Sequence, residues 1–208
     1  MQKTYLCIDL KCFYASVECV EQGLNPFEVN LVVADPTRSG GAITLAATPA
    51  IKKLGVPSRG RIFEIDPSIE YMIAVPRMHL YMEYSCRVYK IFLEFIAKED
   101  IHVYSIDESF LDITSYLKLY QVNAKELAKK ILDRIYEKTG LTATVGIGTN
   151  LYLAKIAMDI SAKHNADRMA FLNEELYRQT LWHHTPMTDF WMLGNGTERR
   201  LHKLGIYD

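Results

Sequence analysis

The stretch that decides the fold is Tyr104–Asp112, which reads YSIDESFLD. Two β-prone runs, Val103–Ser105 and Phe110–Ile113, lie on either side of Ile106–Ser109, a pattern that predicts an antiparallel pair of strands. Asp107 and Glu108 fall at or beside the connection between those strands. We therefore expect both carboxylates at the same end of the strand pair.

A third carboxylate ends the first predicted strand. Tyr5–Ile8 is a short apolar run that stops at Asp9, as in a buried strand whose last side chain emerges at the edge of a sheet. If a mixed sheet brings this strand beside Tyr104–Asp112, the three acids form a cluster of hard oxygen ligands. Mg²⁺ best relieves the repulsion within such a cluster, and two ions about 3.5–4 Å apart support in-line phosphoryl transfer.

The spacing of the acids leaves a second interpretation open. Asp9 is also suited to cap a helix that starts near Lys11, with Asp107 and Glu108 in an exposed turn. Composition does not decide between the two interpretations.

The remaining patterned segments predict an α+β fold of the ferredoxin-like type, in which helices back antiparallel strands. Apolar residues recur at helical spacing from Glu83 to Ala97. Asn123 and Glu126 form the sequence pattern of a capping box, and Asn150 is placed to cap a further helix. Strands are expected at Leu31–Ala34 and Thr142–Ile147, and after Lys163 two short helices are expected around the glycine turn at 194–196.

Composition excludes several classes of protein. The chain has 208 residues, 49% of them hydrophobic and 24% charged, so it is globular rather than disordered or fibrous. A net charge of -1 removes the argument from a strongly basic footprint, although residues 52–61 form a local basic segment that suits phosphates. No membrane span or secretory signal is recognisable, which predicts a cytosolic protein.

Known cofactor motifs are weak or missing. The four cysteines include no CxxC pair, so neither a zinc cluster nor a disulfide framework is predicted. Gly146-x-Gly148 lacks the third glycine of a dinucleotide fingerprint, and the chain has no GxxxxGK[ST] sequence.

Three motifs together resemble the Y-family (UmuC/DinB-type) translesion DNA polymerases. They are Ile8–Glu18, Tyr104–Asp112 and Gly146–Lys155, in the family's order and spacing, and Lys163 and Met187–Ile206 are similar to later elements. The resemblance implies a palm from residues 1–10 and 77–166, a small fingers insertion at 11–76 and an α-helical thumb at 167–208. It also implies that the C-terminal little-finger domain, which grips DNA in the family, is absent and that the chain is the N-terminal catalytic part.

The resemblance also implies roles for individual residues. The catalytic carboxylates would be Asp9, Asp107 and Glu108, which with the Leu10 carbonyl would ligate two Mg²⁺ ions, with Mn²⁺ as a substitute. Nucleotide-binding candidates by motif position are Lys11, Cys12, Phe13, Tyr14, Thr48, Lys52 and Lys163. Tyr14 matches the aromatic steric gate that excludes a 2′-hydroxyl. The alternative interpretation, an aromatic residue of the core, suits Phe13 better than Tyr14.

The fingers segment departs from the family pattern. Pro49 and Lys52 stand where many relatives have a tyrosine and an arginine on the triphosphate. Lys52 keeps the charge without bidentate geometry, and Thr48 is expected to replace the tyrosine hydroxyl. Arg59 stands where the family often has a small residue above the forming base pair, so it is a candidate contact to the template.

The implied function is a DNA-directed DNA polymerase for lesion bypass in the SOS response, acting on primer-template DNA and dNTPs in the bacterial cytoplasm at the nucleoid. A sliding clamp and accessory repair proteins would dock through the C-terminal part. Two alternatives stay open: another palm-type nucleotidyl transferase, such as a nucleotidyl cyclase, and a noncatalytic DNA-binding or scaffolding relative.

Overall fold

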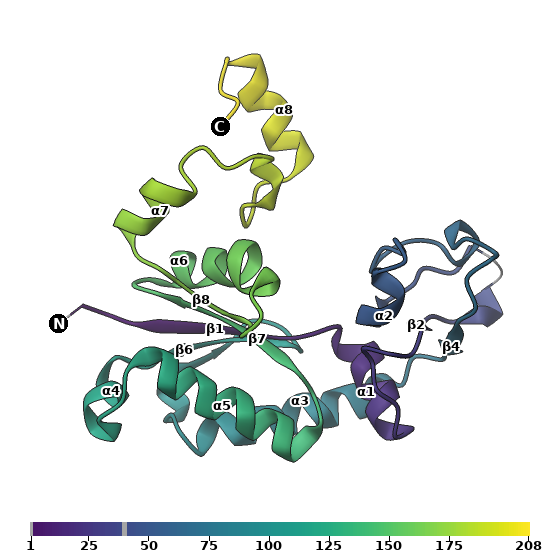
Figure 1. Ribbon diagram of the computed structural model, residues 1–208, viewed down its shortest axis with the longest axis horizontal. Helices are drawn as coiled ribbons and strands as arrows, with labels where there is room; N and C mark the ends of the chain where they lie inside the picture. Colours follow the sequence, from purple (N-terminus) through teal and green to yellow (C-terminus); the bar gives the residue numbers. More distant parts are fainter. Residues whose placement is uncertain (1, 39–40) are drawn as a thin grey trace. The chain divides into compact units, whose positions relative to one another are not determined.

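The computed structural model describes residues 2–38 and 41–208 (Figure 1). The chain forms two compact units, each assembled from segments that are distant in the sequence. The first unit comprises residues 1–9, 92–133 and 143–208, and the second comprises residues 10–91 and 134–142. In the described part of the chain, no helix has both the length and the apolar character that crossing a membrane requires.

A five-stranded mixed sheet is the centre of the first unit. The strand order is β5-β6-β1-β7-β8, in which β6 is antiparallel to both β5 and β1, and β7 is parallel to β8. The strands are β1 (Tyr5–Leu10), β5 (Ile101–Val103), β6 (Glu108–Asp112), β7 (Ala143–Gly148) and β8 (Met169–Leu172). Leu6, Cys7 and Ile8 in β1 are buried, which explains why this strand reads as a continuous apolar run.

Helices cover both faces of this sheet (Figure 1). The helices α4 (Thr114–Tyr120) and α5 (Ala124–Thr139) lie on one face, and α6 (Leu151–Ile156) lies on the other. The chain continues from α6 through a π-helical turn, η4 (Ala157–Ser161), and a 3₁₀ turn, η5 (Ala162–His164). The segment after β8 contains α7 (Glu174–Thr180), η6 (Met187–Asp189) and α8 (Asn195–Lys203), and it packs on α6 through Leu181 and Phe190.

Two glycines let α6 and the π turn lie directly on β7. A Cβ atom on Gly148 would overlap the backbone nitrogen of Ala154. A Cβ on Gly146 would overlap the carbonyl oxygen of Ala154 and the backbone nitrogen of Met158. The Gly-x-Gly pattern of the third motif therefore serves close packing of a helix on a strand, which brings the polar residues of this helix near β1 and β6.

The second unit is built around α1 and a small three-stranded sheet. The order of this sheet is β3-β2-β4, with β2 antiparallel to β3 and parallel to β4. Its core contains Val32, Ile51 and Ile65. The elements are α1 (Phe13–Glu21), β2 (Leu31–Val33), η1 (Pro36–Arg38), β3 (Ala46–Ala47), α2 (Pro49–Lys52), η2 (Ile62–Glu64) and β4 (Met72–Ala74). The helix α3 (Met78–Leu93) follows, and its last two residues belong to the first unit. The 3₁₀ turn η3 (Lys98–Asp100) also belongs to the first unit.

Most predicted elements are confirmed. The reciprocal capping box is present, because the Asn123 amide donates to Glu126 Oε2 and the Glu126 amide donates to Asn123 Oδ1, both at 2.9 Å. Asn150 caps α6 by accepting from the Leu153 amide at 2.8 Å.

Two predictions about elements are wrong in detail. The helix expected over Glu83–Ala97 runs instead over Met78–Leu93 and begins two residues after Pro76. Its end was placed too late because the apolar stripe continues in the sequence beyond the helix into a turn. The strand β8 is missing from the sequence prediction. It has only four residues, and its pairing with β7 rather than a period in its own sequence fixes it as a strand.

Candidate active site

The three acids meet at one end of the strand pair β1 and β6. Asp9 lies directly opposite Glu108 in the antiparallel register, so their side chains share one face of the sheet. Asp107 precedes β6 in a turn that the Glu108 carbonyl closes by accepting from the amides of Tyr104 and Ser105, both at 3.0 Å. The Ser105 hydroxyl donates to Asp107 Oδ1 at 2.7 Å and so holds that carboxylate in place.

This arrangement excludes the interpretation of Asp9 as a helix cap. The N-cap of α1 is Cys12, and Asp9 belongs to β1. Glu108 is only 7% exposed, which is incompatible with an exposed turn.

Asp9 is a buried carboxylate that has two other carboxylates nearby. Burial is the largest cause that raises the pKa of Asp9, to about 6, and the carboxylates of Asp107 and Glu108 raise it further. The ammonium groups of Lys163 and Lys155 act in the opposite direction. A bound metal cation beside Asp9, in addition to these two ammonium groups, would stabilise the ionised form of its carboxylate.

Glu108 is held by two neighbours. Lys155 Nζ, on α6, donates to Glu108 Oε2 at 2.8 Å, and both side chains are 8% exposed. Burial opposes the charge of Lys155, but its contacts with Glu108 and Asp159 outweigh burial and raise its pKa. On the other side, the buried Cys7 thiol donates to Glu108 Oε1 at 3.3 Å, and burial followed by the charge of Glu108 raises the pKa of this thiol.

A carboxylate that the sequence prediction did not include joins the two lysines. Asp159 Oδ2 lies 3.0 Å from Lys155 Nζ, and Asp159 Oδ1 accepts from Lys163 Nζ at 2.8 Å. Burial lowers the pKa of Lys163, but the charge of Asp9 and the hydrogen bond with Asp159 outweigh burial, so the net change is upward. These ion pairs could have been predicted from the sequence, because Lys155, Asp159 and Lys163 stand at every fourth position.

The donor set fits a divalent cation in chemistry, but both oxygens of Glu108 already contact other side chains. Carboxylate oxygens are the ligands that Mg²⁺ prefers, and three of them gather at this sheet edge. Among the residues that the structure describes, however, no three His, Cys, Asp or Glu side chains are arranged to hold one ion. Glu108 Oε2 accepts from Lys155 Nζ, and Glu108 Oε1 accepts from the Cys7 thiol. The structure therefore places the three acids at one sheet edge without arranging them as ligands of one ion. Leu10, whose carbonyl is the fourth expected ligand, is the last residue of β1.

In the second unit, Tyr14 and Phe13 occupy different environments. Phe13 is 3% exposed and belongs to the core, as the alternative interpretation of that residue held. Tyr14 is half-buried, and its ring stacks on Tyr81 with a centroid distance of 4.4 Å and an interplanar angle of 16°. Tyr81 is fixed in turn by donating to the buried Glu18 carboxylate at 2.7 Å. The Tyr14 ring therefore rests on a rigid support.

The structure corrects the role expected for Thr48. Its side chain is buried, and its hydroxyl donates to the Val29 carbonyl at 2.7 Å and accepts from the Leu31 amide at 3.1 Å. A hydroxyl committed to two backbone groups is not available to a triphosphate, so Thr48 supports the fold of this unit instead.

The other nucleotide-binding candidates of this unit lie around the start of α1. Lys52 is half-buried and its Nζ donates to Cys12 Sγ at 3.1 Å, which joins α2 to the N-cap of α1. Cys12 has a positive φ of 52°, which is uncommon for a residue other than glycine. Lys11 Nζ lies over the Phe27 ring, 5.7 Å from its centroid.

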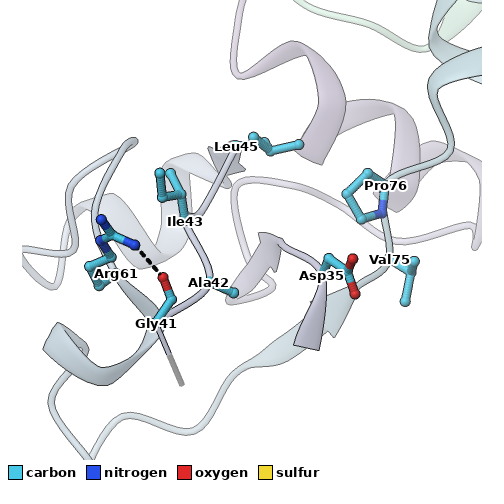
Figure 2. A pocket seen from close by; sticks show the side chains of 8 residues that line it. All are labelled: Asp35, Gly41, Ala42, Ile43, Leu45, Arg61, Val75 and Pro76. Atoms are coloured by element: carbon cyan, nitrogen blue, oxygen red, sulfur yellow. Dashed lines mark hydrogen bonds between the residues drawn. The ribbon is translucent and has the colours of Figure 1, made fainter. Parts of the chain in front are cut away.

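A largely apolar pocket of about 620 Å³ opens within the second unit. Figure 2 shows Ile43, Leu45 and Val75 around it, with Asp35 and Arg61 at its polar positions. Arg61 donates to the Gly41 carbonyl (Figure 2). Arg59 is exposed and is not among the eight described residues that line the pocket. Arg61, which the sequence analysis placed only in the basic segment 52–61, is the arginine of this pocket.

The sequence matches a known protein family over most of its length. A family model described as impB/mucB/samB matches residues 8–159. UvrX of Bacillus subtilis (strain 168), named for UV-damage repair, is 38% identical over 206 residues, which cover 99% of this chain and 48% of that protein. DNA polymerase IV 2 of the same organism is 36% identical over 209 residues, which cover 99% of this chain and 49% of the relative. The chain thus spans about half the length of the curated relatives it matches.

Solved structures share the fold. A Y-family DNA polymerase chimera matches with a TM-score of 0.81 and 27% identity, over 99% of this chain and 58% of that one. The structure titled DinB from Sulfolobus solfataricus matches with a TM-score of 0.77 and 28% identity, over the same shares. The predicted α+β fold class is therefore confirmed.

Proposed function

Because the chain belongs to the impB/mucB/samB family, we propose that it is the catalytic core of a DNA-directed DNA polymerase for translesion synthesis. Primer-template DNA and dNTPs are its proposed partners, and the cytoplasm at the nucleoid is its proposed location. A sliding clamp and accessory repair proteins are further proposed partners on the basis of the family alone. The palm, fingers and thumb boundaries likewise stay a proposal.

The observation that carries the proposal is the register of β1 and β6. Asp9 and Glu108 face each other across the strand pair, and Asp107 stands in the adjoining turn. In-line attack on an α-phosphate needs carboxylates in this arrangement to hold cations, and it needs little covalent chemistry from the protein. When bound by Asp9, Asp107, Glu108 and the Leu10 carbonyl, two Mg²⁺ ions would supply charge neutralisation at the attacking and leaving oxygens.

The side chains would act mainly by position and charge. The primer 3′-hydroxyl loses its proton to solvent water, its oxygen forms a bond to the α-phosphorus, the bond from that phosphorus to the bridging oxygen breaks, and pyrophosphate leaves. Lys163, whose side chain is 41% exposed and whose charge interacts with that of Asp9, would meet the charge on the departing phosphates. Lys52, in the second unit, is the other ammonium proposed for the triphosphate.

Two features of the second unit would select the nucleotide. Tyr14 would lie under the sugar and exclude a 2′-hydroxyl, and its stacking on Tyr81 makes the ring hard to displace. The apolar pocket beside Ile43 and Leu45 suits the flat face of a base pair. Arg59, which is exposed, stays a candidate contact to the template.

A primer-extension assay tests the proposed function. The parent chain is expected to extend a primer with Mg²⁺ on undamaged and abasic templates at low salt, where few phosphate contacts suffice for binding. Asp107→Asn removes a charge without a change of shape and should abolish extension. Asp133→Asn, which alters an exposed carboxylate paired with Lys129, is the matched control and should extend normally. No extension by the parent, or full extension by Asp107→Asn, would refute the proposal.

A further inference from the structure

Asp159 lies between two lysines that face the candidate catalytic acids. Its Oδ2 is 3.0 Å from Lys155 Nζ and its Oδ1 is 2.8 Å from Lys163 Nζ. The Asp159 side chain is 21% exposed, so water competes less for these contacts than at the surface. Each oxygen of the Asp159 carboxylate thus pairs with a different ammonium group.

Asp159 is four positions from each lysine, the spacing at which side chains are neighbours on one side of a helix. Lys155 and Lys163 are eight positions apart, and eight residues of a regular α-helix turn by about 800°, roughly 80° beyond two full turns. A π-helical segment contains more residues per turn, so η4 (Ala157–Ser161) takes up part of that excess rotation. Asp159 is the central residue of this π turn.

Each lysine reaches a different acid of the candidate site. Lys155 Nζ donates to Glu108 Oε2 at 2.8 Å within a pair of side chains that are both 8% exposed. Lys163 stands near enough to Asp9 for the two charges to influence each other. An uncharged residue at position 159 would leave both ammonium groups without their shared partner.

We propose that Asp159 is a positioning residue of the reaction, which orients Glu108 through Lys155 and holds the Lys163 ammonium where the triphosphate of the incoming nucleotide binds. This inference rests on the proposed function and deepens it. Asp159 itself touches neither the substrate nor the reacting atoms. Asp159 lies in a π turn, and such turns are frequent at functional sites.

The kinetic test compares Asp159→Asn with Asp133→Asn. Both substitutions remove the charge of an aspartate that pairs with a lysine four positions away, but Asp133 and Lys129 are exposed. For Asp159→Asn we expect kcat/KM for dNTP to fall roughly 10- to 100-fold, the equivalent of one charge-assisted hydrogen bond. The KM for dNTP should rise while the affinity for primer-template DNA stays unchanged, and Asp159→Glu should recover part of the loss.

A readout without metal or substrate follows the lysines directly. Ammonium ¹H–¹⁵N signals of Lys155 and Lys163 are expected in the parent chain, because their hydrogen bonds slow exchange with water. Asp159→Asn should shift the Lys155 signal and remove the Lys163 signal, and Asp133→Asn should change neither. If Asp159→Asn does not fold, Asp159→Ser removes the same charge with a smaller side chain and takes its place in both experiments.

The outcomes separate this inference from the proposed function. Lower kcat/KM together with changed ammonium signals supports the inference. If the parent extends primers and Asp159→Asn stays within twofold of it, the inference is overturned and the polymerase assignment stands. If the parent chain does not extend primers at all, the proposed function fails and the inference fails with it.

Discussion

Replacement of Lys155 by methionine tests how the structure holds Glu108 before any cation binds. Methionine keeps the unbranched stem of lysine and its packing on the sheet but removes the ammonium. Both members of the pair are 8% exposed, so the change leaves an ionised carboxylate buried with only the Cys7 thiol as a donor. Stranding one member of a buried pair costs about 3–5 kcal/mol. Because Asp159 keeps Lys163, only one carboxylate is stranded, and we expect a loss near the lower end, about 3 kcal/mol.

Urea unfolding followed by tryptophan fluorescence measures this loss in the relevant unit, because Trp182 and Trp191 both belong to the first unit. The matched control is Lys129→Met, which breaks an ion pair whose side chains are 65% and 62% exposed and should cost less than about 1 kcal/mol. Equal losses in the two variants would refute the reasoning, because the Lys155–Glu108 pair would then behave like a surface pair.

Three further predictions concern other parts of the account. Tyr14→Ala should admit ribonucleotides in primer extension while Tyr14→Phe does not; unchanged sugar discrimination in the alanine variant would count against the steric gate. Gly148→Ala should destabilise the first unit by about 3 kcal/mol in urea unfolding, because its methyl group would overlap the Ala154 nitrogen; a neutral effect would contradict the packing of α6 on β7. Burial and the nearby acids raise the pKa of Asp9 to about 6, so the Asp9 contribution favours folding at low pH and is lost as pH rises from about 4 through 6. Asp9→Asn should therefore increase metal-free stability at pH 7 and flatten this part of the pH profile, and an unaltered profile would contradict the burial of Asp9 beside the other acids.

Local signals in the sequence were sufficient for the elements that frame the site. The run Tyr5–Ile8 ending at Asp9 and the acids of Tyr104–Asp112 predicted two strands, and their pairing in the structure confirms that these acids lie at one sheet edge. The resemblance drawn from three motifs is also confirmed by the family match over residues 8–159. These features were predictable because each is recorded in a short window of sequence.

Tertiary contacts decided what the sequence could not show. The availability of the Thr48 hydroxyl depends on the Val29 carbonyl and the Leu31 amide, and nothing near position 48 indicates those partners. The ion pair between Lys155 and Glu108 depends on the packing of α6 on the glycines of β7. The pairing of Asp159 with both lysines was partly predictable, because its four-residue spacing from each of them is visible in the sequence. The π turn that contains Asp159 is a property of the folded chain.

The most direct test of the central claim is electron paramagnetic resonance of Mn²⁺ bound to the chain with primer-template DNA and a nonhydrolysable dNTP. If Asp9, Asp107 and Glu108 are the ligands, the parent chain will show two Mn²⁺ ions coupled at a separation of about 4 Å, and Asp107→Asn will lose the coupled pair. A coupled pair that persists in Asp107→Asn, or its absence from the parent, would contradict the claim that these carboxylates form a two-ion centre.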